Sequence, residues 1–291
     1  MGVPMPKTVR ETASGHYYES DGTPMFQVQC KGSDKMRATS LRDVRSRNLY
    51  PSVTTICSIV KKHWLDYWMQ SQLILVFWEF LQKFIGVLGK NPGKDPNHIL
   101  TAIADSLEKF EREIRSKYQE LNQEAPRAGT EIHKALEHGL KGEGYSEDHT
   151  VIVVAMQDWL AEAGWIPWRM ERKIIPSLCG YGGTIDLICY SKTDMNKFAV
   201  IDFKTSNTIG KSDNKLKCYD NWMMQLVAYK NALYQEDKRY FTAACIDLIV
   251  SRDEPGRIVP FVLNPKEEDR YLQMFMLLKD FYYLQNKLKG E

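Results

Sequence analysis

The chain has 291 residues, 43% of them hydrophobic, which is enough to bury a sizeable core in one or two domains. Its formal net charge of +2 gives little overall attraction for nucleic acid, so any affinity for DNA must come from local patches. Six unpatterned cysteines favour a reducing compartment over a disulfide framework. No apolar segment suits a signal peptide or a membrane span, so we expect a cytoplasmic protein without membrane contact.

The first 125 residues predict a cap that is distinct from the rest of the chain. Residues 15–30 indicate a β-hairpin, because Asp21 and Gly22 form a dipeptide typical of its turn. Residues 31–47 hold six basic side chains against two aspartates. Such a run is either a solvated surface or a contact for DNA phosphates.

Two long helices are expected in the second part of this cap. The helix after Ser52 carries aromatic side chains at helical spacing, from Trp64 to Phe84. This stripe is either buried core or a surface that stacks single-stranded bases. Residues 91–96 break the helix, and residues 97–122 predict a second, highly charged one. The cap could form one wall of a channel for DNA.

The next element is an amphipathic helix over residues 130–140. Ile132, Leu136 and Leu140 recur at helical spacing, and Thr130 is a suitable residue for the start of a helix. His133 stands beside the apolar stripe rather than opposite it. A histidine in this position is either a hydrogen-bonded core residue or a ligand, and the pattern alone leaves both open.

Three strands are predicted after this helix. Residues 165–176 alternate, with Glu171 on the more polar face. The apolar runs at 182–188 and 198–206 flank a polar, turn-like segment, so together they predict a hairpin.

Charged side chains would meet at one rim of that hairpin. Asp202 and Lys204 are two residues apart and share a face of the sheet, and Asp186 lies on the partner strand. Two acids can hold a divalent cation, and a lysine can orient or activate a water. This arrangement suits metal-assisted cleavage of a phosphodiester. An isolated Asp-x-Lys triplet also arises by chance as a solvated strand end.

A loop rich in Gly, Ser and Asn follows the second strand of the hairpin. Its lysines are either solvated or bound to substrate, and their position beside the proposed site favours substrate contact. The lysines expected to contact DNA are Lys211, Lys215 and Lys217.

The chain then predicts a helix and a buried strand. Residues 221–233 have a helical pattern that places Trp222, Gln225 and Tyr229 along one side. Residues 241–250 are almost continuously apolar, which is typical of a strand buried on both faces. The order of elements is therefore helix, three strands, helix, strand.

Two elements are expected at the end of the chain. Residues 257–263 indicate an edge strand, because Pro260 is tolerated only there. Residues 266–288 predict a closing amphipathic helix.

Five short motifs in this order resemble the RecB-type nucleases of the PD-(D/E)xK, restriction-endonuclease-like superfamily. They are Gly129-Thr-x-x-His133, Glu171, Gly183-x-x-Asp186, Asp202-x-Lys204 and Gln225-x-x-x-Tyr229.

The resemblance covers about residues 126–250 and implies an α/β fold with an αβββαβ core around a central mixed sheet. The nuclease domain would span residues 126–291, with a C-terminal strand and helix, and the N-terminal cap would span residues 1–125. Similar proteins are phage-encoded exonucleases, CRISPR-associated RecB-like exonucleases and the mitochondrial genome maintenance exonuclease. The stretch from Gly15 to Ile56 also looks like the leader of the phage-encoded group.

The resemblance also implies a metal centre. Asp186, Asp202 and the backbone carbonyl of Phe203 would bind one or two Mg²⁺ or Mn²⁺ ions, and His133 would complete the site from the first helix. Lys204 would position or activate the attacking water and stabilise charge on the phosphate. Hard cations of this kind prefer oxygen ligands, and manganese tolerates an imidazole.

Further residues would support catalysis or bind DNA. Glu171 matches an acid that lies at or near the metal in this family, and Gln225 and Tyr229 would hold the DNA backbone or the catalytic lysine. At the start of the first helix, Arg127 and Thr130 are expected to contact DNA.

Other cofactors are not expected. Several relatives hold an iron–sulfur cluster with one cysteine before the core and three after it, but this chain has no cysteine after Cys245. It also lacks the Gly-x-x-x-x-Gly-Lys-[Ser/Thr] pattern of an ATP site, so a helicase motor would be a separate chain.

We therefore expect a metal-dependent DNA exonuclease of viral origin that acts on single strands or duplex ends. It would serve replication, recombination or DNA degradation, with a separate helicase or recombinase as a potential partner. The alternatives are a structure-specific endonuclease with the same site and a DNA-binding accessory protein that retains a dead nuclease fold.

Overall fold

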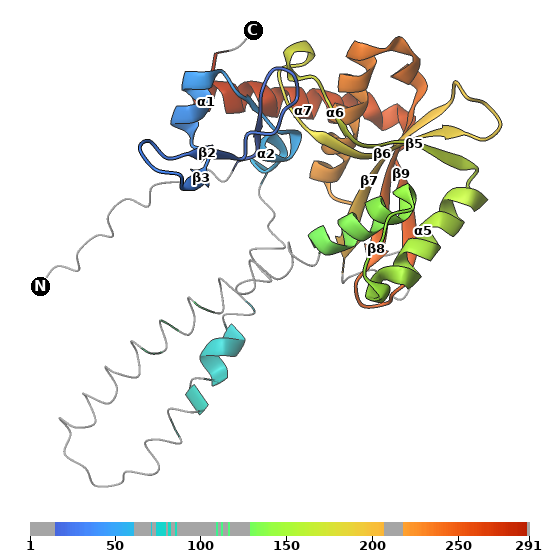
Figure 1. The fold of residues 1–291 in the computed structure, drawn as a ribbon, viewed down its shortest axis with the longest axis horizontal. Coiled ribbons are helices and arrows are strands. Elements are labelled where there is room, and N and C mark those ends of the chain that lie inside the picture. The colour runs from blue at the N-terminus through green and yellow to red at the C-terminus, as the bar shows by residue number, and fades with distance from the viewer. Residues whose placement is uncertain are drawn as a thin grey trace, which may run out of the picture. The chain divides into compact units, whose positions relative to one another are not determined.

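The computed structural model describes residues 15–60, 129–206 and 218–289, with a few helical positions between residues 71 and 116 (Figure 1). The chain divides into two compact units, one made of Met1–Val60 with His133–Glu291 and the other of Lys61–Ile132. This division differs from the predicted boundary at residue 125. The described N-terminal residues belong to the same unit as the sheet.

A five-stranded mixed sheet lies at the centre of the larger unit (Figure 1). In spatial order its strands are β5 (Trp165–Lys173), β6 (Thr184–Ser191), β7 (Phe198–Ser206), β8 (Ala244–Ser251) and β9 (Ile258–Val262). Only β7 and β8 are parallel, and the other neighbours are antiparallel. The predicted α/β class and the predicted hairpin of β6 and β7 are confirmed.

The parallel strands β7 and β8 are joined by a crossover connection, which parallel strands require, and this connection contains α6 (Asp220–Glu236). The predicted strand at 241–250 is present but begins later, because Phe241 belongs to a 3-10 turn over Lys238–Thr242. Pro260 lies on the edge strand β9, as expected of a residue that has no N–H to donate.

Helices cover both faces of the sheet (Figure 1). On one face, α6 and α7 (Pro265–Gln285) pack against each other and the sheet, and buried Tyr181 and Phe275 meet edge to face in this core. The helix α5 (Thr150–Glu162) lies on the other face. Sequence reasoning missed α5, although its buried residues recur at helical spacing: Ile152, Val153, Met156 and Leu160. The predicted helices at 130–140 and 266–288 are confirmed, over 129–141 and Pro265–Gln285.

The N-terminal segment, residues 15–60, folds differently from the hairpin predicted for residues 15–30. Its turn is present, with Gly22 at a φ of 87° and its N–H bonded to the Glu19 carbonyl at 3.0 Å. The two arms of the turn are joined by a single antiparallel bridge, between Tyr18 and Pro24, and do not continue as a paired hairpin. Instead, β1 (Tyr17–Tyr18) pairs with β4 (Tyr50–Pro51), and β2 (Gln27–Gln29) pairs with β3 (Met36–Ala38).

The helix predicted after Ser52 begins there but is short. The Ser52 hydroxyl accepts the Thr55 N–H at 2.9 Å and caps α2 (Val53–Cys57), which gives way to a turn at residues 58–60. Threonine and serine favour caps over helix interiors, which accounts for the early end. The rest of the predicted cap falls largely outside the described residues, although Phe77 and Trp78 are described and exposed.

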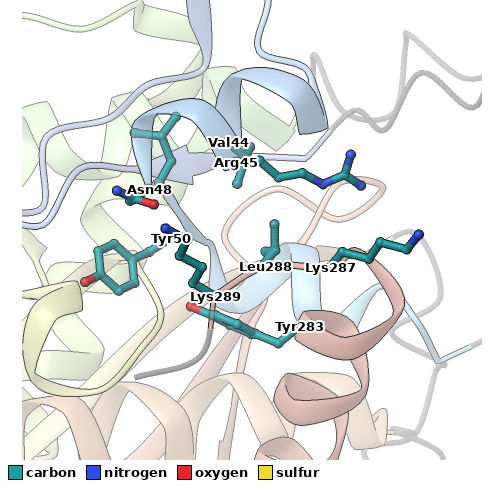
Figure 2. A pocket seen from close by; sticks show the side chains of 9 residues that line it. Val44, Arg45, Asn48, Tyr50, Tyr283, Lys287, Leu288 and Lys289 are labelled. Carbon is teal, nitrogen blue, oxygen red and sulfur yellow. The ribbon is translucent and has the colours of Figure 1, made fainter.

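The basic run at residues 31–47 includes α1 (Leu41–Arg47), and two of its arginines make structural contacts. Arg37 forms an ion pair with Asp43 at 2.6 Å, and Arg45 donates to the Asn286 carbonyl at 2.9 Å. Figure 2 shows the pocket between α1 and the end of α7, where Arg45 faces Lys287 and Leu288.

Among the described residues, no helix has both the length and the apolar character needed to cross a bilayer.

Hydrogen bonds join the N-terminal segment to the strand region at Gly182. The Gly182 N–H donates to the Pro51 carbonyl and its own carbonyl accepts the Val53 N–H, both at 2.9 Å. The Tyr18 ring covers this glycine so closely that an added Cβ would overlap it. Glycine is therefore required by close approach at this position.

Replacing Gly182 with alanine should lower the free energy of unfolding by about 1–3 kcal/mol, because the new methyl group must displace the Tyr18 ring or the backbone. Urea unfolding measures this loss. Gly144→Ala is the matched control, since no atom lies within 4 Å of the position that its methyl group would take. Equal stability of the two variants would show that Tyr18 can move aside freely.

Candidate functional site

A cavity of about 420 Å³ opens beside β6, β7 and α6 and collects most of the predicted site residues. Those that line it are His133, Glu171, Asp186, Asp202, Lys204, Gln225 and Tyr229. The N-terminal segment supplies a second set, which sequence reasoning missed: His16, Tyr18, Phe26, Ser52 and Thr54. The cavity is thus built from segments that lie more than a hundred residues apart in the sequence.

A buried hydrogen-bond network fixes Lys204. Alternation along β7 directs Asp202 and Lys204 to the face covered by α6, where they form an ion pair. The Lys204 ammonium also donates to Gln225 Oε1 at 2.8 Å. The Gln225 amide donates in turn to Asp202 Oδ1 at 2.9 Å and to the Tyr229 hydroxyl at 3.0 Å. Gln225 and Tyr229, one turn apart on α6, therefore hold the acid and the lysine in place.

Asp186 lies beside Asp202 across the hairpin. Leu187 pairs with Ile201, so the two aspartates are the next positions along the antiparallel strands. Asp186 Oδ2 accepts the Phe203 N–H at 2.7 Å. Burial and the neighbouring Asp202 carboxylate raise the pKa of Asp186 well above its ordinary value. Two carboxylates this close together repel each other, so a positive charge beside them stabilises the ionised pair.

His133 approaches this pair from the helix over residues 129–141. Its Nδ1 lies 3.6 Å from Asp186 Oδ2, and its ring meets the Phe203 ring edge to face at 6.0 Å. Burial lowers the pKa of His133, an effect that the Asp202 charge opposes. The neutral imidazole is the form that can bind a metal ion.

The donor types fit a hard divalent cation, since two carboxylates and a neutral imidazole face one cavity. Within the described ranges, however, no three His, Cys, Asp or Glu side chains are closed around a common point. The Lys204 ammonium already pairs with Asp202. A cation would therefore compete with Lys204 for the Asp202 carboxylate.

Glu171 has an unusual backbone. Its φ is +49°, which is uncommon for a residue other than glycine and strained within a strand. Its neighbours on β5 pair with Leu187 and Ile185, so Glu171 lies opposite Asp186. Burial, followed by the charges of Glu137 and Asp202, raises its pKa. This local distortion accompanies the placement of a third acid at the cavity.

Asp247 on β8 is a further buried acid that sequence reasoning missed. It pairs in register with Asp202, is 0% exposed, and neither carboxyl oxygen has a hydrogen-bond partner among the residues described. Burial raises its pKa to about 8, although the nearby Lys204 charge opposes the shift. The signal was present in the sequence as a single charged residue within an apolar strand.

Other predicted site residues lie away from the cavity or outside the described residues. Thr130 is exposed near the start of its helix. Phe203 lies on β7 between Asp202 and Lys204, and its backbone carbonyl remains only a predicted ligand. The DNA contacts predicted outside the described residues are Arg127, Lys211, Lys215 and Lys217.

Comparison with known proteins adds no relative to this picture. No family model matches the chain, and no curated protein matches it significantly. The resemblance to RecB-type nucleases therefore stays a prediction that rests on the motifs.

Proposed function

We propose that the chain is a metal-dependent DNA exonuclease with a restriction-endonuclease-like core, acting on single strands or duplex ends. The observation that carries this proposal is the convergence of Asp186, Asp202 and Lys204 with His133 at one cavity. These residues come from β6, β7 and the helix over residues 129–141. A merely solvated strand end would not need a buried glutamine to fix its lysine.

The order of elements supports the same core. The helix at 129–141 is followed by β5, β6 and β7, then by α6 and β8, which is the αβββαβ order. The helix α5 is an addition between the first helix and β5.

Asp186, Asp202 and His133 would hold Mg²⁺ or Mn²⁺, which when bound supplies a more acidic water and neutralises charge on the phosphate. Burial favours the neutral amine of Lys204, but the neighbouring Asp202 carboxylate outweighs burial, and the pKa of Lys204 is raised. Lys204 is therefore a charged donor. It would orient the water and stabilise the phosphate oxygens rather than remove a proton.

One observation favours the catalytically inactive alternative. The ion pair between Lys204 and Asp202 neutralises a carboxylate that the metal would need. An accessory protein that binds DNA without cleaving it could keep this pair permanently.

Incubation of the purified chain with linear and circular DNA, single- and double-stranded, tests these possibilities. We expect hydrolysis of linear DNA in Mg²⁺ or Mn²⁺, none in EDTA, and survival of closed circles. Efficient cutting of circular single strands would indicate the endonuclease alternative, and activity in EDTA would exclude the metal site. DNA binding without cleavage under any condition would indicate the inactive accessory protein.

A further inference from the structure

An aromatic wall stands beside the acids and the lysine in the cavity. It is formed by His16, Tyr18 and Phe26 of the N-terminal segment. The His16 and Phe26 rings stack with centroids 4.4 Å apart and an interplanar angle of 26°. Tyr18 meets Phe26 edge to face at 5.5 Å. Three aromatic rings, of which Phe26 contacts the other two, thus border a cavity whose other lining residues are mostly polar or charged.

This wall is exposed, unlike a packing cluster. Phe26 leaves 38% of its surface in solvent and His16 is also exposed, whereas Tyr18 is buried beneath them. Single exposed apolar side chains are common, but a stacked pair at the rim of a charged cavity offers a flat apolar surface where a ligand would lie. Phe26 covers one face of the His16 ring, and this partial burial lowers the pKa of His16 and favours the neutral imidazole.

Hydrogen bonds fix the backbone of the residues that form the aromatic wall. The His16 N–H donates to Thr55 Oγ1 at 2.9 Å, and its carbonyl accepts the Ser52 N–H at 2.8 Å. The Phe26 carbonyl accepts the Thr39 N–H at 3.1 Å. The backbone of both rings is therefore fixed before any ligand arrives, which reduces the entropy lost on binding.

We propose that the stacked pair of His16 and Phe26 receives an unpaired nucleobase of the DNA strand whose phosphate lies at Asp202 and Lys204. Every base has a π-face that can stack on an aromatic ring, but within a duplex that face is covered by neighbouring bases. The wall would therefore select single-stranded or frayed ends. This inference rests on the proposed nuclease function and specifies its substrate.

Fluorescence of 2-aminopurine, a base analogue that dims when it stacks, tests the contact without chemistry. Two single-stranded oligonucleotides, each with the analogue at one end, are titrated with the protein in EDTA. We expect the wild type to quench at least one of them. Phe26→Ala should abolish the quenching and weaken binding roughly 5- to 140-fold, the range expected for one stacked base.

Three further variants separate stacking from folding. Phe26→Leu keeps apolar bulk against Tyr18, so it should retain the melting temperature and still lose the quenching. Phe26→Trp should restore the quenching. Phe281→Ala removes a phenylalanine on α7 that is 50% exposed and does not line the cavity, and it should behave like the wild type. Quenching by Phe26→Leu at the wild-type level would overturn the proposal.

The binding assay also separates this inference from the proposed function. Quenching that depends on Phe26 in a protein that never cleaves DNA would support stacking and remove the nuclease. Cleavage by the wild type without any quenching would support the nuclease and overturn stacking. If both hold, Phe26→Ala should reduce the preference for single-stranded over blunt duplex DNA in Mg²⁺.

Discussion

Replacing Lys204 with alanine should lower the rate of DNA cleavage by roughly two to three orders of magnitude, the range for loss of one donor that stabilises charge in the transition state. The ammonium is buried against Asp202 and Gln225, so no other cation described at the cavity can take its place. DNA affinity should remain largely intact, because one lysine is a small part of the phosphate contacts. Single-turnover cleavage and fluorescence anisotropy measure the two quantities separately.

Two control variants test whether the effect is specific to Lys204 and to its ammonium group. Lys197→Ala removes an exposed lysine just before β7, at the opposite end of that strand from the cavity, and should leave cleavage unchanged. Lys204→Arg keeps the charge but replaces the compact ammonium, whose hydrogen bond Gln225 Oε1 accepts, with a larger planar group, and it should remain impaired. Parallel loss of binding and cleavage in Lys204→Ala would show that the lysine only docks the DNA.

Replacing His133 with alanine should raise the metal concentration needed for half-maximal cleavage by about tenfold or more, in line with the effects seen when metal sites lose supporting groups. His133 reaches Asp186 from a separate helix, and as a ligand it adds a bond only when metal is present. The melting temperature in EDTA should therefore change little. A metal titration of cleavage and melting curves with and without metal provide the measurements.

His138→Ala is the matched control, because His138 lies on the same helix but outside the cavity, with its ring bonded to the Gly144 carbonyl at 3.0 Å. Its metal requirement should equal that of the wild type. If His133 instead serves packing, its loss should cost about 1–3 kcal/mol of stability with or without metal. A lowered melting temperature with normal metal dependence would therefore contradict the ligand assignment.

The parts of the fold predicted correctly were those specified by neighbouring residues. Alternation and a polar turn specify the hairpin of β6 and β7, and two-residue spacing places Asp202 and Lys204 on one face. Helical spacing likewise brings Gln225 and Tyr229 together on α6. At each of these positions, local pattern and tertiary packing require the same structure.

The parts that were missed depend on contacts between distant segments. No local pattern indicates that Pro51 bonds to Gly182, or that Phe26 lies beside Asp186 in one cavity. The boundary was therefore predicted at residue 125, whereas the residues up to Val60 fall in the same compact unit as the sheet. Asp247 was missed for another reason, since its importance appears only when β8 pairs with β7 and brings it level with Asp202.

The N-terminal segment and the residues that it contacts lie far apart in the sequence, and this affects how the chain folds while it is being synthesised. Tyr17 and Val53 are fully buried in the final structure, yet the hydroxyl that Tyr17 contacts belongs to Tyr282, 265 residues later. On the ribosome, these side chains emerge long before the surface that covers them, and such exposed apolar groups are prone to aggregation. The aromatic wall would take its final place late in folding, after α7 has been translated. Premature termination within α7 would leave the N-terminal segment without its Tyr282 contact even though every acid of the cavity had been made.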